Sequence, residues 1–480
     1  MPNSLRRPLF ASLLLIILTL AFWQVTPLFI APPLGAAPAL TAPDADSLSV
    51  APLKRQRHEA AAQSATMAPP PQTTVEGLWA ALKQSAQKWR RAALWIPLAL
   101  LGPGWLLAWL LRPSGRRPVT PLVAGISMAL VPFSYLLLAF TPLRLYEPLI
   151  HSFLQASVLL LILLMLQDLS RLRAAFNPKW RGALFLLAFA LVISIGTWLL
   201  IGTRPSVVST DEALRAFAST LAHEAQLSRV EAPLPPAALA ANFSQITRQS
   251  VEETMQLMTL MLGVALLPAL FGLAAEVGQK PTSALWVMPL AWVAAIGWHL
   301  SEGAQLTLLY TMVVLPVAVA LGLRALRATE RSWLTLFLAA IPLATLGFLQ
   351  GVGALLAWLF SLLYALLWPE SEDERGARPS SALILWRSAL WLVMGMLLYL
   401  PSWWFWDDPF ARFDLMLPAY ALTIVTAALA LFVGLLTERA RSFAWLIAAL
   451  ALPLCLLLAA WWVLPPDTLP ALGLLDQLWR

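Results

Sequence analysis

Charged side chains are scarce in this 480-residue chain. They make up 12% of it and apolar residues 60%, whereas soluble domains carry about 25% charged residues. The few charges cluster in short segments, and the apolar runs between them reach about 20 residues, the length of a helix that spans a bilayer core. The pattern excludes an ordinary soluble enzyme. It also disfavours a membrane barrel, whose strands alternate apolar and polar residues.

Cysteine is nearly absent as well. The single Cys455 lies inside an apolar run, so the chain forms no intrachain disulfide in any compartment. Phosphate-binding loops, nucleophile elbows and nucleotide-binding glycine motifs are also missing. The sequence therefore indicates no reaction, and we expect no cofactor and no metal.

Ionisable side chains are missing from the middle of the apolar runs. Ion-coupled carriers and proton pumps usually keep such groups at that depth, so their absence argues against a proton antiporter or a redox-driven pump. A channel or a lipid carrier stays open, because hydroxyl, backbone and aromatic groups can line its passage. Arg387 lies near the end of its run, where its side chain can extend to the water.

The apolar runs predict an all-α, polytopic transmembrane protein with about 13 spans, or 12 if one long segment forms a single helix. That segment, 333–368, is either one tilted helix or a hairpin that turns at 350–353, and we favour the hairpin. The expected spans are 9–30, 92–111, 119–141, 148–167, 182–202, 255–275, 283–300, 304–323, 333–349, 352–368, 382–400, 415–436 and 443–464.

Basic residues predict the orientation of these spans. Most of the Lys and Arg residues outside two long loops fall on one side, and short cytoplasmic loops are rich in such residues. We therefore expect a cytoplasmic N-terminus and a periplasmic C-terminus. The net charge of +7 follows from this arrangement, and we predict no nucleic-acid partner. The excess of Arg over Lys fits a GC-rich bacterial genome, so we expect the inner membrane of a bacterium.

The chain divides into five segments. Residues 1–30 form a first span, or alternatively a signal peptide. Residues 31–91 form a periplasmic loop that begins with low-complexity sequence and ends in an amphipathic surface helix. Residues 92–202 hold spans two to five. Residues 203–254 form a second periplasmic loop, and 255–480 hold spans six to thirteen.

The second periplasmic loop is expected to contain two amphipathic helices. Ser209 and Glu212 have the spacing of a capping box at the start of the first helix. Apolar residues then recur at helical spacing, as expected of one buried face on each helix. These faces comprise Leu214, Phe217 and Leu221 in the first helix and Leu239, Phe243 and Ile246 in the second.

Proline lies inside several expected spans. Each proline removes a backbone donor and can kink its helix, which would open carbonyl groups toward a cavity and suit a moving transporter. We nevertheless favour ordinary packing, because proline is more frequent in membrane helices than in soluble ones. The residues concerned are Pro97, Pro132, Pro268, Pro289, Pro316, Pro342 and Pro453.

The segment 401–414, PSWWFWDDPFARFD, is the first candidate site. It lies at the predicted outer end of a span, where an aromatic belt is expected. Its aspartates can pair with the nearby arginine, accept protons, or bind a cation or an ammonium headgroup. We take the candidate substrate-binding residues to be Trp403, Trp404, Trp406, Asp407, Asp408 and Arg412.

Two pairs of His and Glu form a second candidate site on the same predicted face. Glu147 and His151 lie four residues apart at the top of one span, and His299 and Glu302 lie in a short outer loop. Zinc accepts both ligand types if the loops converge. Because no clustered ligand motif is present, we instead expect side chains at the membrane interface that face headgroups and water.

The run 404–407, Trp-Phe-Trp-Asp, resembles the tryptophan-rich outer loop of the haem-handling cytochrome c assembly proteins. Positions 410–412 hold Phe, Ala and Arg, where that loop has an acidic residue after its Asp-Pro step. The resemblance would make His151 or His299 a candidate iron ligand. It covers four residues, and we do not assign the family.

Three functional classes fit these features. The first is transport or flipping of an amphipathic envelope substrate, such as a lipid or a lipid-linked glycan. The second is an outer-leaflet enzyme acting on a lipid-linked substrate, for which Asp407, Asp408, Glu147 and His299 are the available acids and bases. The third is a non-catalytic subunit or assembly factor. We favour transport over an enzyme. The expected partners are membrane lipids and, in the third class, other membrane-protein subunits.

Overall fold

The computed structural model describes the chain in separate stretches, and every element in them is helical. The stretches are 101–108, 119–139, parts of 182–195, 212–224, 233–247, 249–278, 281–301, 305–328, 332–349, 351–367, 379–401 and 417–435. No strand occurs among these residues, so the prediction of an all-α fold is confirmed for them. The first span, the last span and both termini lie outside the described residues.

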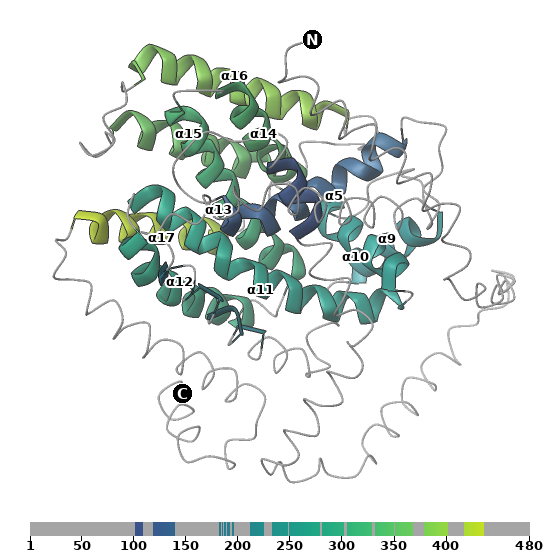
Figure 1. The fold of residues 1–480 in the computed structure, drawn as a ribbon. Coiled ribbons are helices and arrows are strands. Elements are labelled where there is room, and N and C mark those ends of the chain that lie inside the picture. The colour runs from purple at the N-terminus through teal and green to yellow at the C-terminus, as the bar shows by residue number, and fades with distance from the viewer. Residues whose placement is uncertain are drawn as a thin grey trace, which may run out of the picture.

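The described helices are shown in Figure 1. Their bounds are η2 Thr120–Leu122, α5 Val123–Ala139, α9 Glu212–Glu224, α10 Leu234–Thr247, α11 Val251–Gly278, α12 Pro281–Ser301, α13 Leu306–Arg327, α14 Ser332–Leu349, α15 Gly351–Leu367, α16 Ser381–Tyr399 and α17 Leu417–Leu435.

Three of these helices are long and apolar enough to cross a membrane. They are α11 with 28 residues, α13 with 22 and α16 with 19. A helix rises about 1.5 Å per residue, so even α16 reaches about 29 Å, close to the thickness of a bilayer core. Shorter apolar stretches lie in α5, α12, α14, α15 and α17. The described part of the chain thus has the helices of a membrane protein.

Helix α13 lies at the centre of the bundle (Figure 1). All its residues, from Leu306 to Arg327, are buried. Helices α11 and α14 pack most extensively against it, and α5, α15, α16 and α17 also touch it. A helix that is apolar on all sides is expected in such a central position.

Helix α16 lies at the edge of the bundle (Figure 1). Its inward face buries Ile384, Arg387, Ser388, Trp391 and Gly395, while large apolar side chains on its other faces are exposed. In water, a contiguous apolar surface of this kind would mark a binding or aggregation site, whereas lipid tails solvate it. The exposed side chains are Leu383, Leu385, Trp386, Val393, Met396 and Leu397 on α16, with Leu355, Leu356, Leu359, Leu363 and Leu367 on neighbouring α15.

The chain reverses direction between α14 and α15, as the hairpin interpretation predicts. Near the end of α14, Gly347 lies against the ring of Tyr399, at the end of α16. In α15, however, the Trp358 Nε1 donates to the Ser388 carbonyl at 2.9 Å, near the start of α16. If α14 and α15 formed one continuous helix, the residues of α15 would lie past the end of α16 and could not reach Ser388 near its start.

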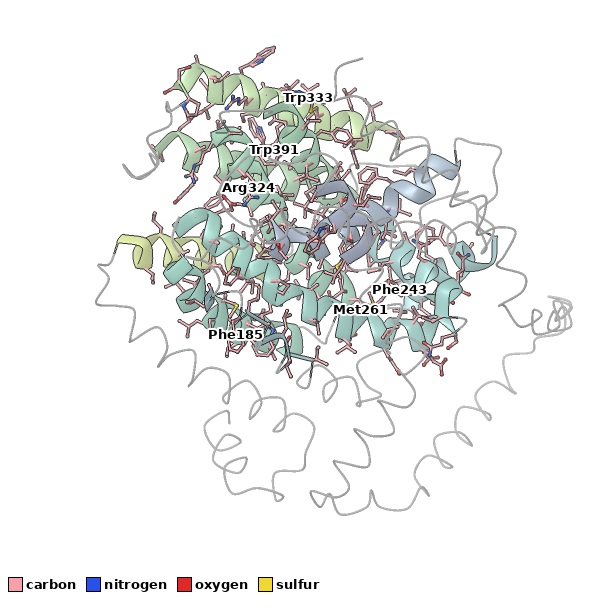
Figure 2. The ribbon with its side chains drawn as sticks, in the orientation of Figure 1. Phe185, Phe243, Met261, Arg324, Trp333 and Trp391 are labelled. Carbon is pink, nitrogen blue, oxygen red and sulfur yellow. The ribbon has the colours of Figure 1, made fainter. Side chains whose placement is uncertain are left out.

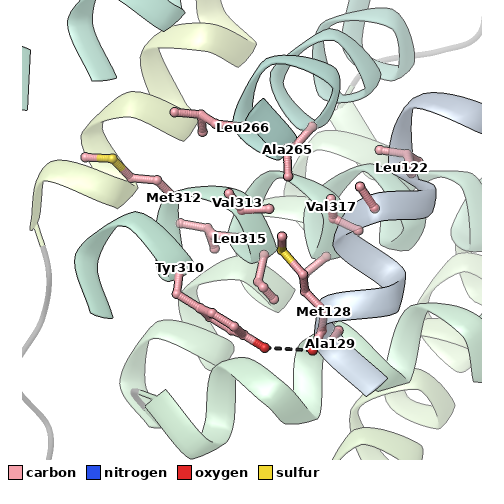
Figure 3. Close-up of a cluster of buried hydrophobic side chains, with 14 of the residues drawn as sticks. Leu122, Met128, Ala129, Ala265, Leu266, Tyr310, Met312, Val313, Leu315 and Val317 are labelled. Atoms are coloured by element: carbon pink, nitrogen blue, oxygen red, sulfur yellow. Dashed lines mark hydrogen bonds between the residues drawn. The ribbon is translucent and has the colours of Figure 1, made fainter. Parts of the chain in front are cut away.

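Hydroxyl groups from two other helices bond to carbonyls in the turn before Pro132 in α5, and Figure 3 shows the bond from Tyr310. Pro132 has no N–H, so the Met128 carbonyl four residues earlier loses its helical partner. The Tyr310 hydroxyl donates to that carbonyl at 2.7 Å. The Thr345 hydroxyl donates to the Ala129 carbonyl at 2.8 Å. This proline therefore serves helix packing, because the carbonyls it opens are bonded to α13 and α14.

The segment 203–254 contains the two helices α9 and α10, which pack against each other. Helix α10 also packs against α5, α11 and α14 and is buried from Leu234 to Ala241. Its run of small alanines lets neighbouring helices approach closely, so α10 is part of the packed bundle. The predicted apolar positions that are buried are Leu214, Phe217 and Leu221 in α9, and Leu239 and Phe243 in α10.

Candidate functional site

The candidate residues predicted from the sequence lie almost entirely outside the described residues. This holds for Glu147, His151, Glu302 and all of 402–416, which includes the tryptophans, aspartates and arginine of the first candidate site. His299 belongs to α12, but its side chain is outside the description. Their roles in substrate binding stay predictions.

Four charged side chains are buried inside the described bundle, and they gather at one end of it. They are Glu276, Arg324, Arg327 and Arg387, none more than 7% exposed. We call these four residues the arginine cluster, and Figure 2 labels Arg324 in it. At this end α11, α13 and α15 finish and α14 and α16 begin. We call it the arginine end of the bundle.

The sequence places each member of the arginine cluster near a helix end. Glu276 precedes the last residue of α11 by two positions. Arg324 and Arg327 lie in the last turn of α13, and a spacing of three puts both on one face. Arg387 lies in the second turn of α16 and on its inward face. Four charges separated in sequence therefore converge at one level of the bundle.

Glu276 and Arg324 form a buried ion pair. The Arg324 Nε donates to Glu276 Oε1 at 2.8 Å, and the Arg324 Nη2 donates to the same oxygen. The attraction in a low-dielectric interior offsets the cost of removing both charges from water only while both partners are present. The pair thus ties the end of α11 to the end of α13.

Arg327 and Tyr364 close the end of α11. The Arg327 Nη1 donates to the Glu276 carbonyl at 3.3 Å, and the Tyr364 hydroxyl donates to the Val277 carbonyl at 2.8 Å. The guanidinium carbon of Arg327 lies 5.0 Å from the centroid of the Tyr364 ring, which allows a cation–π contact. The last carbonyls of a helix lack partners within the helix, and these two side chains supply them.

Arg387 closes the end of α13 in the same way. Its Nη1 donates to the Leu326 carbonyl at 3.3 Å and also to the Ala328 carbonyl. The position near the end of the apolar run would allow this side chain to reach the water, but it stays buried, at 7% exposed. The physical reason is that the unpaired carbonyls at a helix C-terminus carry partial negative charge and attract a cation.

The cluster holds three guanidinium groups and one carboxylate among the described residues. The carboxylate is bonded to Arg324, so the cluster contains no pair of groups suited to acid–base catalysis. Arg327 and Arg387 donate to the carbonyls at the ends of α11 and α13. The cluster therefore joins helix ends through charged hydrogen bonds.

Metal chemistry finds no support in this part of the chain. No group of three or more His, Cys, Asp or Glu residues that could bind a metal occurs among the described residues. Glu147, His151 and Glu302 lie outside those residues, and so does the side chain of His299.

No family model, curated protein or solved structure matches this chain. The four-residue resemblance to cytochrome c assembly proteins thus gains no support, and function must be argued from geometry.

The sequence alone does not reveal the arginine cluster, because arginines at the ends of apolar runs are also expected from membrane orientation. One signal could have suggested it. Glu276 is an isolated acidic residue at the end of a long apolar run, and such a residue needs a cationic partner if it is buried. The pair Arg324 and Arg327, at the end of the equally apolar α13, was the available partner.

Proposed function

We propose that this protein is a polytopic protein of the bacterial inner membrane that moves an amphipathic envelope substrate, a lipid or a lipid-linked glycan, across the bilayer. The observation that carries the proposal is the arginine cluster. It places buried charge at one end of an apolar bundle, directly beside helices with exposed apolar faces. A substrate with a polar head and an apolar tail needs both kinds of surface close together.

Helix α16 joins these two surfaces. Arg387 lies on its inward face, and Leu385 and Trp386 on its exposed faces. A polar head held at the cluster would leave the tail free to lie along α16 and the exposed leucines of α15. The groups that bind head and tail would then belong to the same helix, which supports binding of a single amphipathic molecule.

Internal prolines support a bundle that can change its packing. Pro268 in α11, Pro289 in α12, Pro316 in α13 and Pro342 in α14 each lie inside a described helix. Sharp kinks in helices concentrate at proline. Helices α11 and α13 carry members of the arginine cluster, and α14 begins beside it. Bending at these prolines would therefore move the cluster relative to the neighbouring helices.

The proposed topology has about 13 spans, with a cytoplasmic N-terminus and a periplasmic C-terminus. The arginine end then faces the cytoplasm, since cytoplasmic helix ends are the ones enriched in Lys and Arg. The segment 401–414, with Asp407 and Asp408, would face the periplasm. The two candidate sites would thus contact the substrate head at opposite faces of the membrane.

A vesicle assay tests the proposed function. The full chain is reconstituted into vesicles of phosphatidylethanolamine and phosphatidylglycerol with a trace of head-labelled fluorescent phosphatidylglycerol, and dithionite is added to bleach the outer leaflet. Because moving lipid reaches the outer leaflet and is bleached there, we expect bleaching to continue past the outer-leaflet share seen in protein-free vesicles.

The control is a membrane protein of similar span number, reconstituted at the same density, which corrects for lipid disorder caused by any inserted helix. The assay is run with and without an imposed membrane potential. Bleaching that equals this control under both conditions would reject translocation of this class of substrate.

A further inference from the structure

We infer that Trp333 and Trp386 contact the interface between the headgroups and the acyl chains of a phospholipid bilayer, and that this interface crosses the bundle at the arginine end. The partner of this surface is therefore lipid. The inference goes beyond the proposed function, because it requires neither a substrate nor its movement.

Two tryptophans are exposed at the arginine end of the described bundle. Trp333 is 61% exposed and Trp386 is 67% exposed. Trp333 lies in the first turn of α14 and Trp386 in the second turn of α16. These helices pack against each other and both begin at the arginine end. Two large amphipathic rings thus point away from the bundle near the same end of it.

The exposed surface of α16 changes from polar to apolar across its first two turns. Ser380 and Ser381 are exposed at its start, and the Ser380 hydroxyl accepts from the Leu383 backbone N–H at 3.3 Å. Beyond Trp386 the exposed side chains of α16 are all apolar, namely Ala389, Val393, Met396 and Leu397. An indole combines an apolar ring with an N–H donor, so tryptophan is enriched where membrane and water meet. Trp386 lies at such a boundary.

Arg387 gives an independent indication of the same level. It directly follows Trp386 in the chain but lies on the inward face of α16. A charged side chain is costly at the centre of a bilayer and much less so near a helix end at the interface. The burial of Arg387 and the rest of the arginine cluster at this end therefore fits a level close to the headgroups.

A protein partner fits this surface less well than lipid does. Tryptophan is also common in protein interfaces, but a polar rim surrounds the apolar centre of such interfaces. Apart from the indole of Trp386, the exposed side chains of α16 from Leu383 to Leu397 include no polar one. Exposed leucines on neighbouring α15 extend this apolar surface. Acyl chains require no polar rim, so they are the occupant that this surface favours.

Depth-dependent quenching of fluorescence in bilayer vesicles tests the inference. Single cysteines are introduced into the full chain by Trp333→Cys, Trp386→Cys and Val393→Cys in a Cys455→Ser background and labelled with a small thiol-reactive fluorophore. The vesicles contain phospholipid with a nitroxide either beside the glycerol or near the end of an acyl chain. We expect the labels at 333 and 386 to be quenched more by the nitroxide beside the glycerol. The label at 393 should show the reverse order, because it lies two turns, about 10 Å, further along α16.

Leu385→Cys keeps both tryptophans and repeats the measurement if Trp386→Cys does not fold. Leu385 is 51% exposed and adjacent to Trp386, so its label should show the same order of quenching as the label at 386. Ser381→Cys is the matched control on the polar side of the boundary. Its label should respond more strongly to a water-soluble quencher than the label at 393 does. Substitutions at exposed positions such as these seldom destabilise a protein.

Each outcome decides the inference. Stronger quenching at 385 or 386 by the nitroxide near the chain end would place the interface elsewhere and overturn it. Labels that no lipid nitroxide quenches would also overturn it and indicate that another protein or a second copy of the chain covers this face. Equal access of the water-soluble quencher to 386 and 393 would place the face in water, which contradicts the inference as well. A negative result in the translocation assay leaves these measurements unchanged, so the two proposals can fail separately.

Discussion

Replacing Arg324 with methionine is expected to destabilise the folded protein by about 3–5 kcal/mol, the largest effect of any single substitution at the cluster. The change leaves the Glu276 carboxylate, which is 2% exposed, without its ion-pair partner. A buried charge that loses its partner keeps the full cost of its removal from water. The measurement is thermal or denaturant unfolding in detergent, followed by tryptophan fluorescence.

The double variant Glu276→Leu, Arg324→Met separates the charge from the packing. It replaces both partners with apolar side chains, and such replacements of buried pairs are often neutral. We therefore expect it to recover most of the stability lost by Arg324→Met. The control is Arg215→Met in α9, where the side chain is partly exposed and a change within about 0.5 kcal/mol is expected. Equal stability of Arg324→Met and Arg215→Met would contradict the buried ion pair.

Replacing Gly322 with alanine is expected to destabilise the protein by about 1–3 kcal/mol, the cost of overpacking a core. A Cβ atom at this position would lie 2.2 Å from Cη2 of Trp391, whose ring is fully buried. Neither the indole nor α13 at the centre of the bundle has free space to move into. The measurement is the same unfolding experiment.

The matched control is Gly182→Ala, because a Cβ atom there meets nothing within 4 Å. In an exposed helical position alanine is favoured over glycine by up to about 1 kcal/mol, so this variant should be neutral or more stable. The two glycine substitutions should thus differ in sign. The same sign and size for both would show that α13 and α16 do not pack through Gly322.

The helices themselves could be predicted from the sequence because hydrophobic run length decides them. The segment 333–349 is helical as α14 Ser332–Leu349, and the segment 352–368 as α15 Gly351–Leu367, so both were correctly predicted as apolar helices. The turn between them was predicted correctly, since two glycines within three residues weaken a helix and the flanking arginines favoured a hairpin.

The contacts between helices could not be predicted because they join residues that are distant in the chain. The Glu276–Arg324 pair spans 48 positions, and the bond from Tyr310 to the Met128 carbonyl spans 182. Helical periodicity identifies a buried face only when the other face is polar. Helix α13 is apolar all round, so nothing in its sequence indicates which neighbour each side meets. For the same reason, the sequence does not indicate that Arg387 bonds to the end of α13.

Cysteine labelling on intact cells tests the central claim, that the arginine end faces the cytoplasm and the opposite side the periplasm. Single cysteines are introduced by Asp373→Cys and Asp408→Cys in a Cys455→Ser background and treated with an impermeant thiol reagent. Position 373 follows α15 at the arginine end, and position 408 follows α16 at the other. The account predicts labelling at 408 on intact cells and at 373 only after permeabilisation. Strong labelling at 373 on intact cells, with none at 408, would contradict it.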